Sequence, residues 1–218
     1  MQEYEKLIRA VPLFKEIEWD DFRFMLNCLR AETKVVQKNG VLLLAGDKPL
    51  YVGIVLVGRL HVVAESEEGN RTLISVVFPG EVFAEAMCCA NVEESPVTVL
   101  ADEDATVLLL DFSHVFRLCK NLCSFHQKLI KNMLRMLANE NLFLQNRLTL
   151  MSIKSIREKV LRYLESFVPS QGRHIVIPFN QTKLAEYLCV DRSALAHELA
   201  RMKRDGLIDY KKNAFTLK

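Results

Sequence analysis

The sequence has no apolar run long enough to cross a membrane as a helix, which takes about 20 residues. Its first stretch, MQEYEKLIRAVPLF, also lacks the basic start and the small-residue cleavage site of a signal peptide. These absences argue against a membrane partner and predict a cytoplasmic location. In that compartment we expect the six cysteines to be free thiols.

Motifs for catalysis and for metal binding are missing as well. We find no nucleophile–base pair, no glycine-rich phosphate loop and no CxxC or HExxH spacing. The sequence therefore predicts a binding protein that is not an enzyme and has no metal site. A protein-interaction module is an alternative to a nucleic-acid-binding protein. A steep salt dependence of affinity for duplex DNA separates the two.

The charge of the chain is unevenly distributed. The 218 residues have room for one large or two modest domains, and their net charge is only +2. Residues 152–218 hold 13 Lys and Arg against 7 Asp and Glu, a net charge of +6, which leaves −4 for residues 1–151. A basic part joined to an acidic part is typical of a nucleic-acid-binding protein with a separate sensing domain. A chance imbalance is the alternative.

The first half of the chain changes from helical to β-rich spacing. Residues 4–32 carry apolar side chains at helical spacing, interrupted by Pro12. From about 34 to 111, short β-rich runs alternate with glycines, and EEGN (67–70) is a good hairpin turn. Many short strands with regular turns predict a small antiparallel barrel or roll. The runs are 41–45, 51–57, 59–64, 72–78, 97–101 and 106–112.

Residues 113–150 form one long helical pattern without Pro or Gly. Two apolar stripes run along it, so two faces of the helix must be buried. We expect one face to pack on the roll and the other on the same helix of a second subunit; a single fully buried helix is the alternative. The predicted dimer interface follows the heptad spacing of Leu122, His126, Leu129, Met133, Met136 and Phe143. The second stripe is Ile130, Leu134, Leu137, Asn141, Leu144 and Leu148.

Residues 184–208, LAEYLCVDRSALAHELARMKRDGLI, predict a helix-turn-helix. Apolar residues at helical spacing give two short helices joined at Cys189-Val190, and Asp191 is a good N-cap for the second. Gly206 is typical of the helix end. Many helix-turn-helices have Gly where Cys189 stands, and a positive φ there would cost about 1 kcal/mol.

The exposed start of the second helix carries Arg192, Ser193 and His197. A recognition helix contacts base edges and phosphates from such positions. A contact made by the imidazole of His197 would be sensitive to pH near neutrality. An ordinary amphipathic hairpin with a solvated face is the alternative. The full candidate DNA-binding set is Arg192, Ser193, His197, Asn180, Gln181 and Lys203.

Strand-like runs flank this motif and indicate a winged helix-turn-helix. HIVIPF (174–179) precedes it, and LIDYKKNAFTLK (207–218) contains a candidate hairpin turn at residues 211–213. Residues 153–167 form another helical pattern. The predicted domains are an effector-sensing β-roll with N-terminal helices (1–112), a long dimerisation helix (113–150) and a winged helix-turn-helix (151–218). The fold class is α+β.

This order of elements resembles the cyclic-AMP receptor protein and fumarate–nitrate regulator (Crp/Fnr) family of bacterial transcription factors. The most specific segments are VGRLHV (57–62), PGEVF (79–83) and DRSALAHELARMKRDGLI (191–208). The resemblance implies an antiparallel β-roll of the cyclic-nucleotide-binding type. It also implies a homodimer in which a small-molecule effector repositions two recognition helices on palindromic double-stranded DNA, and a contact with RNA polymerase.

The resemblance further implies where a cyclic nucleotide would bind. In that family a Glu after the PGE turn takes the ribose, and an Arg-Ser pair takes the phosphate. Glu85 matches the Glu, but Ser95 and Pro96 stand where Arg and Ser would. Two glutamates at 93–94 add negative charge where a phosphate needs charged donors, so we expect an effector other than cyclic AMP. The candidate effector-binding residues are Glu85, Ala86, Ser95, Val97, Thr98 and Asn141.

The sequence does not identify a cofactor. The iron–sulfur members of that family carry a cluster of N-terminal cysteines, whereas only Cys28 lies there in this chain, so we expect no such cluster. A haem- or thiol-based redox or gas sensor is the alternative to a small organic effector. Free cysteines usually serve as small buried apolar side chains, which favours the organic effector. The side chains relevant to the alternative are Cys88, Cys89, Cys119, Cys123, His61, His114 and His126.

Overall fold

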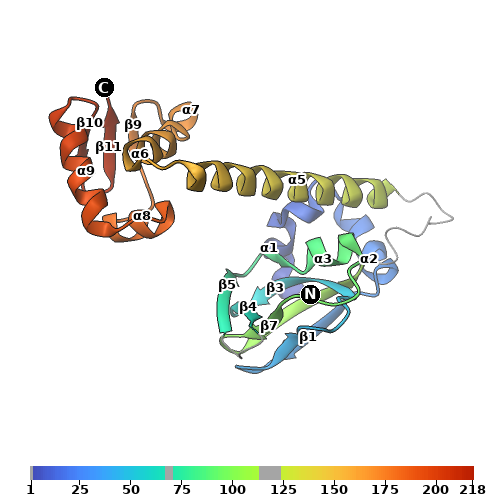
Figure 1. Ribbon diagram of the computed structural model, residues 1–218. Coiled ribbons are helices and arrows are strands. Elements are labelled where there is room, and N and C mark those ends of the chain that lie inside the picture. Colours follow the sequence, from blue (N-terminus) through green and yellow to red (C-terminus); the bar gives the residue numbers. More distant parts are fainter. Residues whose placement is uncertain (1, 67–70, 113–123) are drawn as a thin grey trace. The chain divides into compact units, whose positions relative to one another are not determined.

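The computed structural model describes residues 2–66, 71–112 and 124–218. The chain forms two compact units, residues 1–138 and 139–218, and the division falls within one long helix (Figure 1). None of the helices described is both long and apolar enough to cross a membrane. The predicted turn at 67–70 and the predicted helix start at 113–123 lie outside the described residues.

Short helices open the first unit. They are η1 (Gln2–Tyr4), α1 (Glu5–Ala10), η2 (Pro12–Phe14) and α2 (Trp19–Cys28). Pro12 begins η2 directly after the extended backbone of Val11, which confirms the predicted interruption, because proline suits the first position of a helix and not its interior. Ile8, Phe22 and Met25 from these helices are buried in one apolar core.

Two antiparallel four-stranded sheets follow and form the predicted β-roll. One sheet has the order β1-β8-β3-β6 and the other β2-β7-β4-β5. Each of the six predicted runs contains a strand. The bounds are β1 (Glu32–Val36), β2 (Val41–Leu43), β3 (Tyr51–Val57), β4 (Leu60–Glu65), β5 (Arg71–Val77), β6 (Val82–Phe83), β7 (Thr98–Ala101) and β8 (Ala105–Asp111).

Two of these strands were not predicted, for different reasons. β1 has four exposed residues and pairs with β8 along the sheet edge, so its sequence lacks the apolar alternation of a half-buried strand. β6 has only two residues, too few to show a period. Helix α3 (Glu85–Ala90) follows β6 directly.

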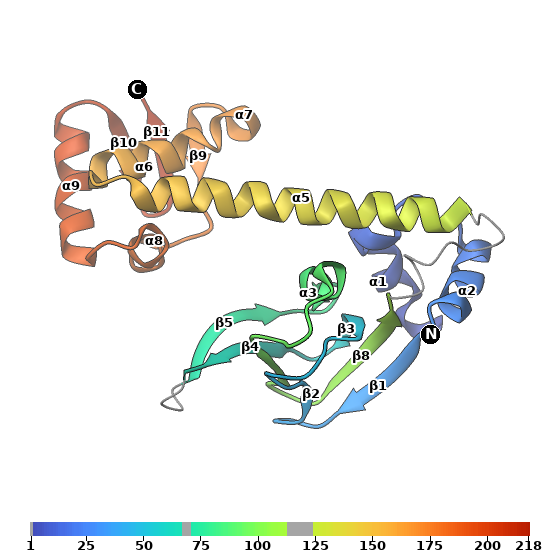
Figure 2. The same cartoon turned by 45° about the vertical axis from the view of Figure 1, so that its right-hand side comes forward.

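The long helix α5 spans Ser124–Ser152 and is continuous in both views (Figures 1 and 2). Its first turns pack on the core of the first unit, beside α1 and α2. Phe125, Leu129 and Met133 are buried there, and the Asn132 side chain donates hydrogen bonds to the carbonyls of Leu13 (3.1 Å) and Lys15 (2.7 Å).

This packing corrects the predicted dimer interface. Leu129 is 0% exposed, His126 and Met133 are also buried, and Met136 packs against the same core, so these four side chains already have partners within the subunit. Phe143 continues the same stripe but is exposed, and Leu122 lies outside the described residues. The second stripe is the more open one: Ile130 and Leu137 are partly buried against the same core, but Leu134, Leu144 and Leu148 are 63%, 52% and 66% exposed. Both stripes have similar spacing, so the sequence pattern does not show which one is buried within the subunit. The shape of the core of the first unit determines this.

The second unit contains the predicted winged helix-turn-helix. Its helices are α6 (Ile156–Glu165), α7 (Val168–Gln171), α8 (Gln181–Leu188) and α9 (Arg192–Arg204). Strands β9 (His174–Val176), β10 (Ile208–Lys211) and β11 (Ala214–Leu217) form an antiparallel sheet in the order β10-β11-β9. The β10–β11 hairpin, here called the wing, turns at Lys212 with φ 56°, where the sequence predicted a turn.

Candidate DNA interface and effector site

Side-chain caps start both helices of the helix-turn-helix. The Asn180 side chain accepts a hydrogen bond from the Lys183 backbone amide at 2.9 Å and so begins α8. Asp191 Oδ1 accepts from the Ala194 amide at 2.9 Å and from the Ser193 hydroxyl, and so begins α9. The hydrogen bond from Ser193, followed by that from Ala194, holds the pKa of Asp191 below its usual range. The cap therefore stays charged at neutral pH.

The turn between the helices is strained at Cys189. This residue has φ 51° and ψ 54°, the left-handed region that favours glycine, which is the conformation for which the sequence predicts a cost to cysteine. The Val190 amide donates to the Ala185 carbonyl at 3.0 Å, which closes the end of α8. A cysteine in this conformation costs roughly 1–2 kcal/mol, so the surrounding contacts must hold the turn in place.

Two cations supply such contacts at the last turn of α8. The buried Lys159 ammonium donates to the Leu188 carbonyl at 2.9 Å. The Arg147 guanidinium donates to the Tyr187 carbonyl, and its carbon lies 3.9 Å from the centre of the Tyr187 ring. Cations are favourable where a helix leaves its carbonyls unpaired and carries partial negative charge. They fix the first helix of the motif to α6 and to the end of α5.

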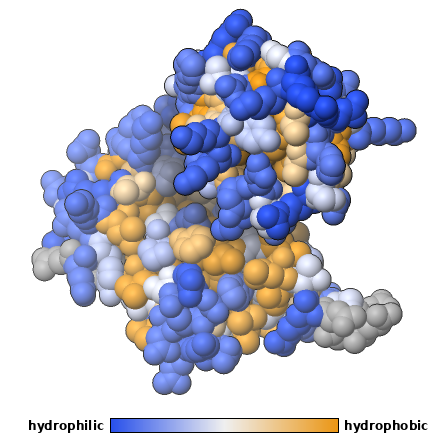
Figure 3. Space-filling view, turned by 90° about the vertical axis from the view of Figure 1, so that its left-hand side faces the viewer, coloured by the Kyte–Doolittle hydropathy of each residue, from blue (hydrophilic) through white to orange (hydrophobic). Residues whose placement is uncertain are grey.

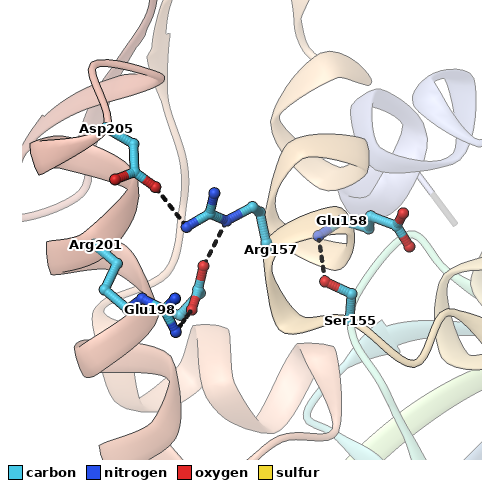
Figure 4. A network of polar contacts seen from close by, with 6 residues as sticks. All are labelled: Ser155, Arg157, Glu158, Glu198, Arg201 and Asp205. Carbon is cyan, nitrogen blue, oxygen red and sulfur yellow. Dashed lines mark hydrogen bonds and ion pairs between the residues drawn. The ribbon is translucent and has the colours of Figure 1, made fainter.

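An ion-pair network fixes α9 to α6 (Figure 4). Arg157 Nε lies 2.6 Å from Glu198 Oε1, and its Nη2 lies 2.7 Å from Asp205 Oδ2. Arg201 also approaches Glu198, at 3.5 Å. The hydrogen bonds that Arg157 donates to the two carboxylates raise the pKa of Arg157 above its ordinary value, Glu198 first and Asp205 second. One side of α9 is thereby anchored, and its opposite side faces solvent.

The solvent side of α9 carries basic groups without partners. Among the described residues, no hydrogen bond or ion pair reaches the side chains of Arg192, His197 or Arg204, and all three are exposed. His197, Ala200 and Arg204 follow one another at three- and four-residue spacing, so they share one face. Lys211 and Lys212 are exposed at the tip of the wing. Arg204 was not predicted, although it lies seven residues after His197, a spacing that places both side chains on one helix face.

Four of the six predicted DNA-binding residues are not open side chains: three take part in caps or an ion pair, and one is half-buried. Asn180 and Ser193 belong to the two caps, and Gln181 is half-buried at the start of α8. The Lys203 ammonium lies 2.6 Å from Asp209 Oδ1, at the first strand of the wing, and 5.7 Å from the Tyr210 ring centre. Lys203 therefore ties α9 to the wing. Arg192 and His197 remain as open side chains on the predicted face.

The β-roll holds a small cavity of about 170 Å³. Asp47 and Lys48 are its charged lining residues, and the Lys48 ammonium lies 2.8 Å from Glu93 Oε2. The other lining residues are uncharged: Leu42, Leu43, Pro49, Leu50, Tyr51, Phe83, Ala84 and Leu109. The cavity thus offers an apolar wall and a cation whose charge is already paired.

Phe83 occupies the space inside the roll. Its ring is buried and packs on Gly53 of β3, where an added Cβ would lie 2.0 Å from the ring. Glycine at this position is therefore what allows the phenyl ring to enter. Since Val55, Val99 and Val107 fill the same core cluster, the interior of the roll is mostly side chain.

None of the six predicted effector-binding residues lines this cavity. The buried Ser95 hydroxyl donates to the Val97 carbonyl at 2.7 Å, and buried Thr98 accepts from the Ala45 amide at 3.0 Å, so both hydroxyls serve the fold. Glu85 and Ala86 begin α3, after Ala84 in the left-handed region. Val97 is half-buried, and exposed Asn141 belongs to the second unit. These residues were predicted from their order along the chain, by comparison with the nucleotide-binding residues of the Crp/Fnr family. That order does not show where the cavity lies.

The described cysteines near the roll are poor nucleophiles. Burial, and then the neighbouring charges of Cys89 and Glu85, raise the pKa of the Cys88 thiol to about 12. Burial and Glu85 also raise the pKa of Cys89. Both thiols therefore stay protonated at neutral pH. His126 Nε2 lies 3.4 Å from Cys28 Sγ. No metal-binding group of three or more His, Cys, Asp or Glu occurs among the described residues, and Cys119, Cys123 and His114 lie outside them.

Comparisons with known proteins agree with this architecture. Residues 33–121 match the family model of the cyclic nucleotide-binding domain. The catabolite activator protein of Thermus thermophilus is 18% identical, with a TM-score of 0.55 over 95% of this chain and 93% of that one. DNR from Pseudomonas aeruginosa is 15% identical, with a TM-score of 0.55 over 100% and 95%.

The c-di-GMP-responsive global regulator CLP of Xanthomonas campestris is 13% identical, with a TM-score of 0.52 over 91% of this chain and 99% of that one. No curated protein sequence matches the chain. The predicted resemblance to Crp/Fnr-type regulators is thus confirmed at the level of the domain and the fold.

Proposed function

We propose that this chain, a cyclic nucleotide-binding domain joined to a winged helix-turn-helix, is a DNA-binding transcriptional regulator without catalytic activity. The observation that carries the proposal is the face of α9, where exposed Arg192, His197 and Arg204 have no partner among the described residues. Arg192 near the start of α9 is placed to pair with guanine, and Arg204 and the wing lysines are placed to contact phosphates. Its DNA partner locates the protein in the cytoplasm.

The proposed active form is a homodimer. The open stripe of α5, with Leu134, Leu144 and Leu148 exposed, has the heptad-like spacing on which a second copy of the helix packs. A two-fold dimer presents two recognition helices to half-sites about one helical turn apart, so the operator is palindromic. On such a site the protein recruits or blocks RNA polymerase.

The effector that we propose is a small, largely apolar organic molecule bound in the roll, not a cyclic nucleotide. At about 170 Å³ the cavity falls below the roughly 300–1,000 Å³ of typical ligand sites. A cyclic phosphate needs charge-assisted donors, whereas Lys48 is already paired with Glu93. Millimolar cyclic AMP should therefore leave the melting temperature unchanged. A rise of several degrees would contradict this assignment.

The redox- or gas-sensing alternative has its own test. Anaerobically purified protein should show no Soret band and no iron–sulfur absorption in its visible spectrum, because ligation would require Cys88 or Cys89 to lose a proton although burial raises the pKa of both thiols. A Soret band would assign the sensing role to haem and would replace the organic effector.

The DNA-binding proposal is tested by fluorescence anisotropy with labelled genomic or random duplexes. Affinity should fall by a factor of ten or more between about 50 and 200 mM salt, since each phosphate contact releases a counterion. The exposed Arg204→Gln and Lys212→Gln variants should reduce the slope of log affinity against log salt. Arg23→Gln, an exposed cation of α2 in the first unit, is the matched control. An affinity for DNA that does not change with salt concentration would indicate a protein-interaction module instead.

A further inference from the structure

The second unit contains a groove that the proposed function does not use. It has a volume of about 670 Å³, roughly four times that of the cavity in the β-roll, and lies within the usual range of ligand sites. It is formed by the end of α5, by α6, by the segment after β9 and by α8. No residue of the exposed α9 face lines it.

Aromatic rings make up much of its wall. Tyr163 lies 5.2 Å from Phe167 and 5.0 Å from Tyr187, measured between ring centres, and Phe179 lies 5.1 Å from Tyr187. Phe143 adds an exposed ring from α5. Five aromatic rings around one groove favour a ligand that is itself flat and aromatic, because offset stacking and edge contacts contribute beyond area burial.

Polar groups in the groove favour a negative charge on that ligand. Arg162 is exposed at the groove, and no hydrogen bond or ion pair to its side chain is found among the described residues. Arg147 keeps its charge over the Tyr187 ring. Glu165 is the one lining residue of opposite charge. The two arginines therefore exceed the acidic charge of the lining.

Tyr163 adds a hydrogen-bonding group. It lines the groove, and its hydroxyl has no hydrogen-bond partner among the described residues. Burial, with a smaller contribution from Tyr187, raises its pKa to about 12, so the hydroxyl remains a donor at neutral pH. A carboxylate at the groove can accept from this hydroxyl and from Arg162.

Dimerisation through α5 leaves the groove open. At 100° per residue, Phe143, Asn146 and Leu150 lie on the α5 face that lines the groove, roughly 140° around the helix from Leu144 and Leu148. The open apolar stripe and the groove therefore occupy different sides of the helix, so a second copy packed on the stripe would not cover the groove.

We propose that this groove binds a flat aromatic carboxylate, with the rings packed against Phe143 and Phe179 and the carboxylate held by Arg162. The site is separate from the cavity in the roll and goes beyond the proposed DNA-binding function. A ligand carboxylate that also attracts Arg147 would compete with its hydrogen bond to the Tyr187 carbonyl, at the last turn of the first helix of the helix-turn-helix.

The test is isothermal titration calorimetry of the full chain with 2-naphthoate. We expect saturable one-to-one binding per chain. Arg162→Gln should weaken it at least tenfold, since it removes the unpaired cation, and Phe143→Ala should weaken it several-fold. Both positions are exposed, so the melting temperature should stay the same. Arg173→Gln, an exposed cation of this unit outside the groove, is the matched control and should bind as the wild type does.

Two ligand controls separate charge from ring stacking. Decahydronaphthalene-2-carboxylate keeps the charge and loses the aromatic faces, and 2-naphthamide keeps the rings and loses the charge; each should bind at least tenfold more weakly. The proposal is overturned by the absence of binding at millimolar 2-naphthoate, by equal affinity in Arg162→Gln, or by equal affinity for the decahydro acid. Salt-dependent DNA binding is measured separately, so either proposal can fail while the other holds.

Discussion

The two units of the molecule differ in the charged groups at their candidate sites. In the first unit the cation that lines the cavity, Lys48, is paired with Glu93, and the polar side chains near the cavity serve the fold, as Ser95 and Thr98 do. In the second unit, cations both hold the fold, as Arg157 and Lys159 do, and stand free on the surface. Among the described residues, the lining of the cavity in the roll therefore offers no unpaired cation to a ligand.

The contrast has a consequence for mutations. Free charge on the α9 face should carry function with little effect on stability, because exposed cations there have no partner to lose. Apolar packing beneath α5 should carry stability, because those side chains fill the core of the first unit. A substitution on the α9 face that destabilises the fold, or a substitution beneath α5 that leaves stability unchanged, would contradict this division.

The largest expected effect is on DNA binding by Arg192→Ala. Loss of a bidentate contact to guanine costs roughly 1–3 kcal/mol for each recognition helix, so the operator affinity of a dimer should fall by a factor between about thirty and about twenty thousand. Electrophoretic mobility shift on a selected operator measures this loss. The melting temperature and the dimer mass should stay unchanged, and wild-type affinity in this variant would remove Arg192 from base recognition.

Next in size is the difference between the two stripes of α5. Leu129→Ala should destabilise the fold by about 2–5 kcal/mol, since its side chain is fully buried in the core. Leu148→Ala, at an exposed position, should barely change the unfolding free energy at concentrations where the chain is monomeric, but should raise the dimer dissociation constant. Urea unfolding and analytical ultracentrifugation distinguish them. The opposite pattern would restore the dimer interface that the sequence predicted.

A titratable group in the first unit gives a smaller effect. Burial lowers the pKa of His126, so below an unfolded pKa of about 6.5 the unfolded state binds more protons than the folded one. Stability from this group is therefore full at neutral pH and falls as the solution is acidified through pH 6, by at most about 1.4 kcal/mol per pH unit. His126→Gln should flatten this part of the profile of unfolding free energy against pH. An unchanged slope would mean that other groups produce it.

The smallest effect is expected at the strained turn of the second unit. Cys189→Gly should raise the unfolding free energy by about 1 kcal/mol or less, because relief of the left-handed strain is partly offset by the greater freedom of glycine in the unfolded chain. Cys189→Ala keeps the strain and removes only the thiol, so it should match the wild type. A loss of stability in the glycine variant would mean that the Cys189 side chain contributes to the turn.

Local patterns were enough to predict much of the fold. The cap at Asp191 follows from neighbouring residues, and the longer strands of the roll follow from their apolar runs and glycines. A helix-turn-helix and a hairpin are built from contacts close in sequence, and their signals are complete within about 25 residues.

Contacts distant in sequence could not be predicted in this way. Phe83 fills the roll because Gly53 lies opposite it, 30 positions earlier in the chain. The buried stripe of α5 is marked by Asn132, whose polar side chain would be placed outside by pattern alone but is held by the carbonyls of Leu13 and Lys15. The role of Lys203 likewise depends on Asp209 in the wing. These choices depend on the shape of the assembled core.

The central claim is that two α9 helices of a homodimer contact a palindromic site, and selection of duplexes from a random pool tests it most directly. The purified protein should enrich two-fold symmetric sequences whose half-sites lie about 10 base pairs apart, and Arg192→Ala should enrich none of them. Failure to enrich any sequence, or enrichment of a single asymmetric half-site, would contradict the account.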